Sequence, residues 1–218
     1  MNMKKIIGLA LAIVVVATSL TGCELVSGLL GGGAGNDGGT ATGKSTLVME
    51  AEYTKMDDVI GAGLSDNTSG LSMIYGDGTN DDWSNGYFVG YMHNDRSVLT
   101  FEFKSSKATS ATITFAIGCE YNDMVLQSGE NIAILVNGVE QSFNWSVECS
   151  ELSDAEFSNY YLNNIQLKEG DNKIEIKILP QDPKTYGPLV DCVKVVATDA
   201  DLSWEPNEDN PYRRDNEV

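Results

Sequence analysis

The stretch LVMEAEY, from Leu47 to Tyr53, decides the fold of this chain. It is the first strand-like run after an apolar leader and a glycine-rich segment. In an extended strand, residues i and i+2 share a face, so Glu50 and Glu52 are expected to point the same way and the residues between them the other way. Two like charges on one face repel unless water or a cation separates them. The pair therefore predicts either a solvated outer face or a site for a hard cation such as calcium, which prefers oxygen ligands.

Residues 1–22 have the features of a bacterial export signal, because two lysines precede an apolar stretch from Ile6 to Leu20. The tetrapeptide LTGC that ends at Cys23 resembles a lipobox, in which the cysteine is diacylated after export and becomes the mature N-terminus. The small residues and the cysteine argue against a membrane-spanning anchor. We expect Cys23 to hold the protein on the cell membrane, exposed on its extracytoplasmic side, with residues 23–46 as a flexible linker.

The strongly acidic composition of the chain argues against some classes of binding partner. The chain has 218 residues, 32 of them acidic and 14 basic, for a net charge of −18. Such an excess of negative charge argues against nucleic acid and against anionic lipid headgroups as partners. Once the leader and the tails are set aside, the length suits one domain with a hydrophobic core.

The body of the chain, residues 47–198, consists of short alternating runs with turn signals between them and no sustained helical periodicity. The pair Asn137-Gly138 is a strong hairpin signal, and residues 168–172 predict another turn. The expected strands cover residues 86–92, 97–103, 111–117, 131–136, 139–147, 164–167, 173–179 and 189–196. This pattern predicts an all-β fold, a β-sandwich jelly roll in a single domain, followed by a polar disordered tail over residues 199–218.

The sequence lacks the marks of a catalytic centre. His93 is the only histidine, and it lies in a predicted turn with no nucleophile signature nearby. A glycosidase needs two carboxylates flanking a cleft, and no pair lies in a recognisable motif. We therefore expect no enzymatic activity.

Three cysteines lie in the predicted domain and allow three different single disulfides, each of which leaves one thiol over. A bond between Cys119 and Cys149 would staple the loops beside Tyr121. Cys192, in the last predicted strand, is then expected to be a buried free thiol.

Six short motifs occur in an order that is typical of one group of proteins. They are EAE at 50–52, SNGYFVG at 84–90, CEY at 119–121, VNG at 136–138, LKEGDNKI at 167–174 and LVDCVKV at 189–195. In this order they resemble the carbohydrate-binding modules of families 6 and 35, within the galactose-binding-like jelly rolls. The resemblance spans about residues 47–197.

The resemblance implies a structural calcium ion that joins the first strand to the last. The implied ligands are Glu50, Glu52 and Asp191, with backbone carbonyls completing the shell. Asp191 is in phase with Val193 and Val195, so it is expected to face inward. A buried carboxylate without a partner is costly, and a shared cation would satisfy it. The alternative for Asp191 is a salt bridge or an exposed strand end.

The resemblance also implies a sugar-binding cleft formed by loops at one end of the sandwich, where aromatic rings stack on sugar faces and polar groups contact hydroxyls. In place of the asparagine expected just before the last strand, this chain has Pro188-Leu189, and Lys184 could instead engage the carboxylate of a uronic acid. For each tyrosine the alternative is packing at a strand edge, and Trp145 is expected in the core. The implied binding residues are Tyr121, Phe157, Tyr160, Tyr161, Lys184 and Tyr186.

Together these observations predict a non-catalytic carbohydrate-binding module, displayed as a surface lipoprotein, that binds a polysaccharide or oligosaccharide and contains a structural calcium ion. The alternative is a structural or interaction lipoprotein of the cell envelope, with the same fold and a degenerate sugar cleft. The two differ in whether Tyr121, Tyr160 and Tyr161 line one open cleft or pack inward.

Overall fold

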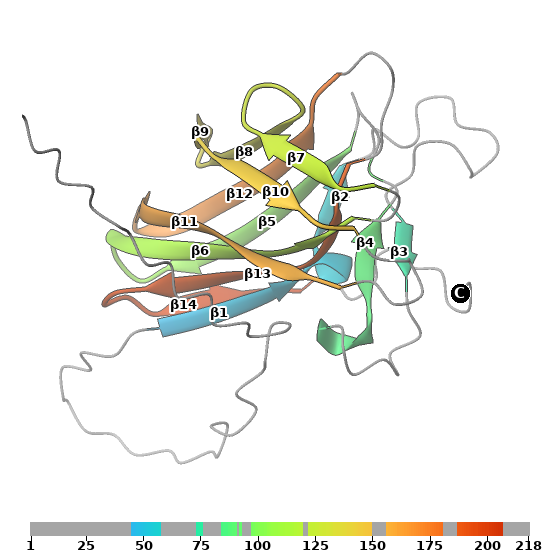
Figure 1. Ribbon diagram of the computed structural model, residues 1–218. Helices are drawn as coiled ribbons and strands as arrows, with labels where there is room; N and C mark the ends of the chain where they lie inside the picture. Colours follow the sequence, from blue (N-terminus) through green and yellow to red (C-terminus); the bar gives the residue numbers. More distant parts are fainter. Residues whose placement is uncertain are drawn as a thin grey trace, which may run out of the picture.

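The computed structural model describes residues 45–57, 73–75, 84–90, 92, 97–119, 122–149, 156–180 and 187–206. These residues form antiparallel β-sheets joined by turns and two short 3-10 turns, η1 (Ala51–Tyr53) and η2 (Ser84–Gly86). Among them, no helix has the length and apolar character needed to cross a membrane. The all-β sandwich predicted from the sequence is confirmed (Figure 1).

Two large sheets face each other across the core. The strands of the first are β11 (Ser158–Leu167), β6 (Thr109–Gly118), β13 (Leu189–Ala197), β4 (Phe88–Gly90) and β3 (Met73–Tyr75), and β1 (Ser45–Glu50) also pairs with β13. The strands of the second are β14 (Leu202–Trp204), β5 (Val98–Ser105), β12 (Gly170–Ile178), β8 (Ile132–Val136) and β9 (Val139–Glu140), and β2 (Lys55–Asp57) also pairs with β5. A separate ribbon pairs β7 (Met124–Gln127) with β10 (Asn144–Val147).

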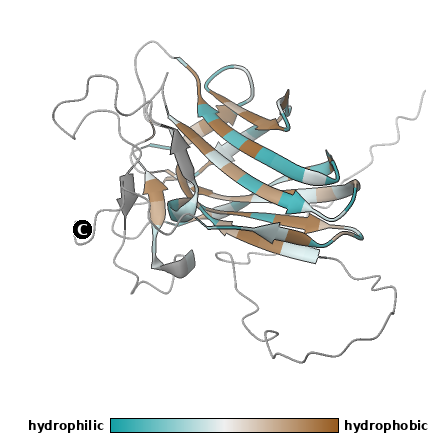
Figure 2. Cartoon of the chain, turned by 180° about the vertical axis from the view of Figure 1, so that it is seen from behind, coloured by the Kyte–Doolittle hydropathy of each residue, from teal (hydrophilic) through white to brown (hydrophobic). Residues whose placement is uncertain are grey.

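The core follows from alternation along each strand, because successive side chains of a strand point to opposite faces. Ile174, Ile176 and Ile178 of β12 are buried, whereas the charged residues between them lie on the other face. Phe101 on β5 and Phe115 on β6 are fully buried in the same cluster. Figure 2 shows the resulting alternation of hydrophobic and hydrophilic residues along the strands. Each such side chain stabilises the fold by about 1.5–3 kcal/mol on burial.

A second, smaller apolar cluster covers the outer face of the first sheet at one end. Phe88 of β4 packs on Phe157, with ring centroids 5.4 Å apart. Ala116, Leu189 and Cys192 complete this cluster. Because both faces of the sheet are covered here, the last residues of β6 and the first of β13 are buried without interruption.

The opening stretch differs from its prediction. β1 ends at Glu50, and Ala51–Tyr53 turn away as η1, which is closed by a hydrogen bond from the Thr54 N–H to the Ala51 carbonyl (3.1 Å). The expectation of one strand through Tyr53, with Glu50 and Glu52 on a shared strand face, is wrong. The physical reason is that β1 pairs with β13 only as far as Glu50, opposite Cys192, and the chain then bends toward the core.

A β-bulge in β13 decides where Asp191 points. Val190 lies opposite Ile117 and Val193 opposite Phe115, so three residue steps on β13 match two steps on β6. The extra residue breaks the strict alternation on which the sequence argument relied, because a bulge re-aims the side chain at its site. Asp191 is nevertheless fully buried, as expected.

The structured part of the chain extends beyond the predicted boundary. β14 lies at residues 202–204, inside the segment expected to be a disordered tail, and it pairs with β5. The predicted run 139–147 is divided, because β9 pairs with β8 whereas β10 pairs with β7. The hairpin predicted at Asn137-Gly138 is confirmed, with φ of 53° and 81° at these residues, as a two-residue turn of this type requires.

A buried asparagine, Asn172, fastens a turn of the second sheet to the turn that connects the first sheet to the second. The side-chain oxygen Oδ1 of Asn172 accepts hydrogen bonds from Asn137 Nδ2 (2.9 Å) and from the Lys168 N–H (3.0 Å). Its amide nitrogen donates to the carbonyls of Lys168 (2.8 Å) and Gly170 (2.9 Å). Asn137 in turn accepts from the Lys173 N–H (3.0 Å). The β8–β9 turn is thereby tied to the β11–β12 turn.

We predict that Asn172→Ala destabilises the fold by about 2–3 kcal/mol, because it leaves buried partners of the turn without hydrogen bonds. Urea unfolding would measure this loss. The neighbouring Asp171 is exposed and makes only a long ion pair with Lys104 (3.9 Å), so Asp171→Asn is the matched control, with an expected change within about 0.5 kcal/mol. Equal effects of the two substitutions would contradict the proposed role of Asn172.

Candidate functional site

Three acidic side chains meet where the first and last strands of the first sheet lie side by side. Glu50 comes from the end of β1, Glu52 from η1 and Asp191 from the bulge of β13. Burial raises the pKa of Asp191 to about 8, and repulsion from Glu50 and Glu52 adds to the rise. A hydrogen bond from the Ser84 N–H to Asp191 Oδ1 (3.0 Å) opposes it. The carboxylates are thus close enough to act on one another, although they come from opposite ends of the domain.

The cluster contains carboxylate oxygens that the described residues do not satisfy. Glu50 Oε2 and Asp191 Oδ2 are buried and accept no hydrogen bond within the described part of the chain. Burial raises the pKa of Glu50 as well, and the Ser84 side chain opposes this rise. A buried carboxylate needs either a proton or a cation to offset the loss of hydration.

The donor chemistry of this cluster fits a hard cation, since all three side chains offer oxygen, which calcium prefers. Among the described residues, no group of three or more His, Cys, Asp or Glu side chains is arranged so that it could hold a metal ion as it stands. The fit therefore rests on the type of donor, the burial and the unsatisfied oxygens. Calcium binding stays a prediction.

We predict that the protein stripped of divalent ions loses stability as the pH rises from about 4 to about 8. The folded state holds a proton on Asp191 up to a pKa of about 8, whereas the unfolded chain releases it near 3.8, so the folded state binds more protons in this window and stability falls with rising pH. Urea unfolding in a chelator at pH 5 and pH 8 measures the slope. Asp191→Asn is expected to flatten it, and an unchanged slope in that variant would contradict this assignment.

The predicted sugar-binding aromatics do not share one surface. Phe157 is buried against Phe88 in the outer cluster. Tyr160 is half-buried, and its hydroxyl donates to the Ser146 carbonyl (2.7 Å). Tyr161 is 54% exposed. Because Tyr160 and Tyr161 are successive residues of β11, they point to opposite faces, and they do not line one cleft together.

The half-buried face of Tyr160 belongs to an aromatic cluster. Trp145 of β10 packs between Tyr160 (ring centroids 5.2 Å apart) and Phe115 (5.6 Å), and it stacks on Phe143 (4.2 Å). These rings pack against the main core. Trp145 is thus half-buried against the core, which its strand phase predicted it would join.

Tyr161 stands in a row of residues on the outer face of the first sheet. The register places it opposite Thr114 of β6, which lies opposite Lys194 of β13, and Lys194 lies opposite Val48 of β1. Cross-strand partners share a face. An exposed phenol ring and a lysine therefore occupy the same surface, two strands apart.

The other predicted residues, Tyr121, Lys184 and Tyr186 of the cleft and Cys23 of the lipid anchor, lie outside the described residues. His93 does too.

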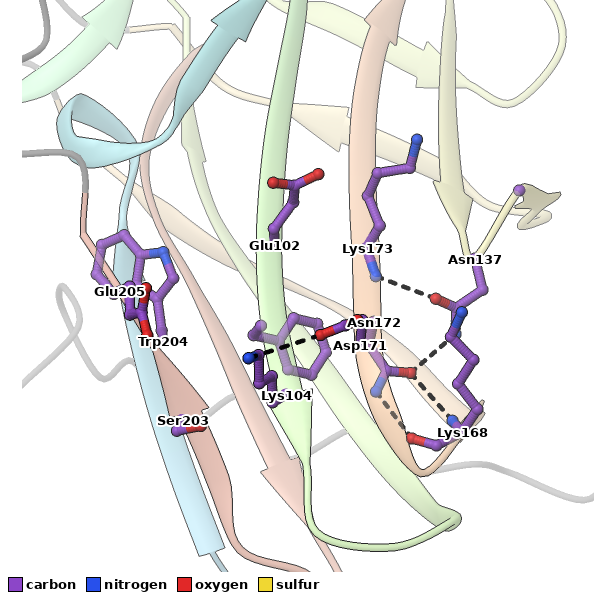
Figure 3. A pocket seen from close by; sticks show the side chains of 12 residues that line it. Glu102, Lys104, Asn137, Lys168, Asp171, Asn172, Lys173, Ser203, Trp204 and Glu205 are labelled. Carbon is purple, nitrogen blue, oxygen red and sulfur yellow. Dashed lines mark hydrogen bonds and ion pairs between the residues drawn. The ribbon is translucent and has the colours of Figure 1, made fainter.

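A groove of about 720 Å³ lies on the second sheet, where the sequence analysis predicted no site (Figure 3). The register places Ser203, Lys104 and Asp171 in one row across β14, β5 and β12, with Glu102 and Lys173 paired alongside. The remaining lining residues are Phe103, Asn137, Gly138, Lys168, Asn172, Trp204 and Glu205. Alternating charged residues on a strand look like an ordinary solvated face, so no sequence signal distinguishes this groove.

The groove offers hydrogen-bond donors and acceptors, and its aromatic lining residues are Phe103 and Trp204. Trp204 pairs with Phe103, and its half-buried ring packs against the core. The ion pair between Lys104 and Asp171 is long and exposed, so it contributes little. Lys173 Nζ lies 3.2 Å from Glu175 Oε2. Partial burial acts to raise the pKa of Glu175, but the hydrogen bonds that it accepts from Lys177 and Lys173 outweigh burial and lower this pKa.

The cysteines differ from their expected states. Cys119 and Cys149 are free thiols, so the expected staple between them is absent from this structure. Cys192 is disulfide-bonded, and the expectation of a free thiol there is wrong.

No protein-family model matches the sequence, and no curated protein sequence matches it. Among solved structures, the chain is similar to a family 35 carbohydrate-binding module from Clostridium thermocellum, with 14% identity, a TM-score of 0.46, and 69% of this chain and 97% of that module covered. A family 35 module from Cellvibrio japonicus Abf62 gives 13% identity, a TM-score of 0.44, and coverage of 73% and 97%.

An exo-β-1,3-galactanase from Phanerochaete chrysosporium, solved with β-1,3-galactotriose, gives 20% identity and a TM-score of 0.46. The match covers 69% of this chain but only 29% of the galactanase. The described residues of this chain form the antiparallel β-sandwich of a jelly roll.

Proposed function

We propose that this protein is a non-catalytic carbohydrate-binding module, displayed on the cell surface as a lipoprotein through Cys23; acylation of the Cys23 thiol would exclude a disulfide between Cys23 and Cys192 in the mature protein. The observation that carries the proposal is the meeting of Glu50, Glu52 and Asp191 between the first and last strands. The resemblance to families 6 and 35 implies a shared site for these three residues. Buried carboxylates need a proton or a cation to offset the hydration that they lose, whereas carboxylates on a solvated surface do not.

In this proposal calcium is held by Glu50, Glu52 and Asp191. When bound, the ion would offset two of the three negative charges and would contact Glu50 Oε2 and Asp191 Oδ2, which lack hydrogen bonds among the described residues. The chain's own residues supply the rest: β1 and β13 align the carboxylates by their pairing, and the Ser84 N–H fixes Asp191 Oδ1. The site acts as a structural clasp and takes no part in sugar contact.

For sugar contact, Tyr161 is the best-placed aromatic of the described residues. Its exposed ring can stack on the C–H groups of a pyranose, with Lys194 on the same face to donate to a hydroxyl or a carboxylate. Tyr121, Lys184 and Tyr186 remain proposed contacts of the loop cleft. The polysaccharide or oligosaccharide ligand follows from this chemistry of aromatic stacking and hydroxyl recognition.

The alternative is a structural lipoprotein of the cell envelope with a degenerate sugar site. A specific observation favours it: Phe157 is buried and Tyr160 packs against Trp145, so two of the implied aromatics are engaged within the fold. The exposure of Tyr161 favours sugar binding instead. Glycan binding decides between the two.

We predict that chelation lowers the melting temperature of the protein by about 5–10 °C, since an ion present at about a hundred times its dissociation constant contributes about 2.7 kcal/mol to a domain of this size. Differential scanning fluorimetry with EDTA, and then with calcium restored, measures the shift. Asp191→Asn is expected to abolish the shift, and Asp171→Asn on the exposed second sheet to leave it intact. A chelator-insensitive melting temperature would rule out the structural ion.

We predict that the protein binds at least one glycan on an array, and that Tyr161→Ala weakens the interaction about three- to tenfold, the range expected for one stacked ring. Isothermal titration with the selected glycan measures the change. Tyr160→Phe, which keeps the packed ring and loses only the hydroxyl, is the matched control and is expected to bind normally. Absence of binding to any glycan would favour the envelope role.

A further inference from the structure

Two free thiols face each other at one end of the sandwich. Cys119 directly follows β6, and Cys149 comes two residues after β10. The Cys149 thiol donates to the Cys119 carbonyl (3.1 Å), and the Cys119 thiol donates to the Val147 carbonyl (3.7 Å). The two thiols are also close enough to influence each other's ionisation. The sulfurs thus lie side by side although they are 30 positions apart in the sequence.

The backbone around this pair is held in place on both sides. Cys119 is fully buried within the main core, in the same cluster as Val147. The Cys149 N–H donates to Asp123 Oδ1 (2.8 Å), which fixes Cys149 against the residue just before β7. A disulfide forms without strain only when its two residues are already placed close together, and here packing and hydrogen bonds supply that placement.

We propose that Cys119 and Cys149 form a dithiol–disulfide couple that is oxidised by an external disulfide, either a small molecule or a protein. The partly exposed Cys149 loses its proton and attacks one sulfur of the reagent, which releases the first reagent thiol. Cys119 then loses its proton and attacks the Cys149 sulfur of the mixed disulfide, which releases the second. Two protein thiols are oxidised, and the reagent disulfide is reduced to two thiols by two electrons and two protons.

The order of the two steps follows from burial. Burial raises the pKa of Cys119 to about 12, and the neighbouring Cys149 thiol and the charge of Asp123 add to the rise. A thiol in this state is not the first nucleophile near neutral pH, because the thiolate is the reactive form. Cys149 meets the reagent, and Cys119 resolves the mixed disulfide inside the fold.

The new bond would link the end of β6 covalently to the end of β10. It would close the segment from Cys119 to Cys149, which contains β7, β8, β9 and β10. Closing such a loop restricts the unfolded chain and thereby stabilises the folded one. The Cys119–Cys149 disulfide would therefore form in an oxidising compartment and stabilise the fold, and it would be reduced to two thiols in a reducing compartment.

The test exposes the purified full-length protein to oxidised glutathione at pH 8 and follows intact mass and a non-reducing peptide map. The expected product has lost two hydrogen atoms, carries a Cys119–Cys149 cross-link, and melts at a higher temperature than the starting protein. Cys119→Ser is expected to retain a lasting glutathione adduct on Cys149, and Cys149→Ser to remain unmodified and keep its original melting temperature.

Several results would overturn this proposal. These are a lasting glutathione adduct on the unmutated protein, a cross-link that joins either thiol to Cys192, or no change in mass at all. The experiment on the unmutated protein is sufficient by itself, so the proposal remains falsifiable even where a serine variant fails to fold. Circular dichroism of each variant identifies such a failure.

Discussion

The constraint on which this structure depends is the meeting of three carboxylates, two buried and one half-buried, where its first and last strands pair. Asp191 lies fully inside the protein beside Glu50 and Glu52, and mutual repulsion reinforces the effect of burial on its pKa. Burying negative charges together is unfavourable unless protons or a cation compensate them. The pairing of β1 with β13 brings the charges together, so any ion held there would also hold the two ends of the domain together.

The rest of the sandwich consists of a packed core, hydrogen-bonded turns and a few exposed side chains on the open sheet faces. The core is built by alternation on the long strands, and turns such as the Asn137–Asn172 pair are tied down by buried hydrogen bonds. A second apolar cluster, containing Phe88 and Phe157, covers one end of the first sheet and removes an implied sugar contact from the surface. Tyr161 is left exposed on the open face of β11.

Neighbouring residues illustrate how far local sequence carries such an argument. Tyr160 and Tyr161 were both predicted to contact sugar, but β11 directs Tyr160 into the Trp145 cluster and Tyr161 into solvent. Both tyrosines lie in β11, which was predicted to begin only at residue 164. The bulge after Leu162 interrupts the alternation of β11, so its first half was not recognised from the sequence. The groove beside Lys104 draws on four separate segments and has no local signature.

The sequence by itself determined the all-β class, the inward faces of the long strands and the Asn137-Gly138 hairpin, because period-two alternation and backbone conformation at a turn are properties of neighbouring residues. Only the tertiary structure decided that Glu52 enters the interior from a 3-10 turn and Asp191 from a bulge, and that residues 202–204 add a strand to β5. Those features arise from pairing between strands that are distant in the sequence. This pairing determines where the chain bends and where a bulge inserts an extra residue into a strand.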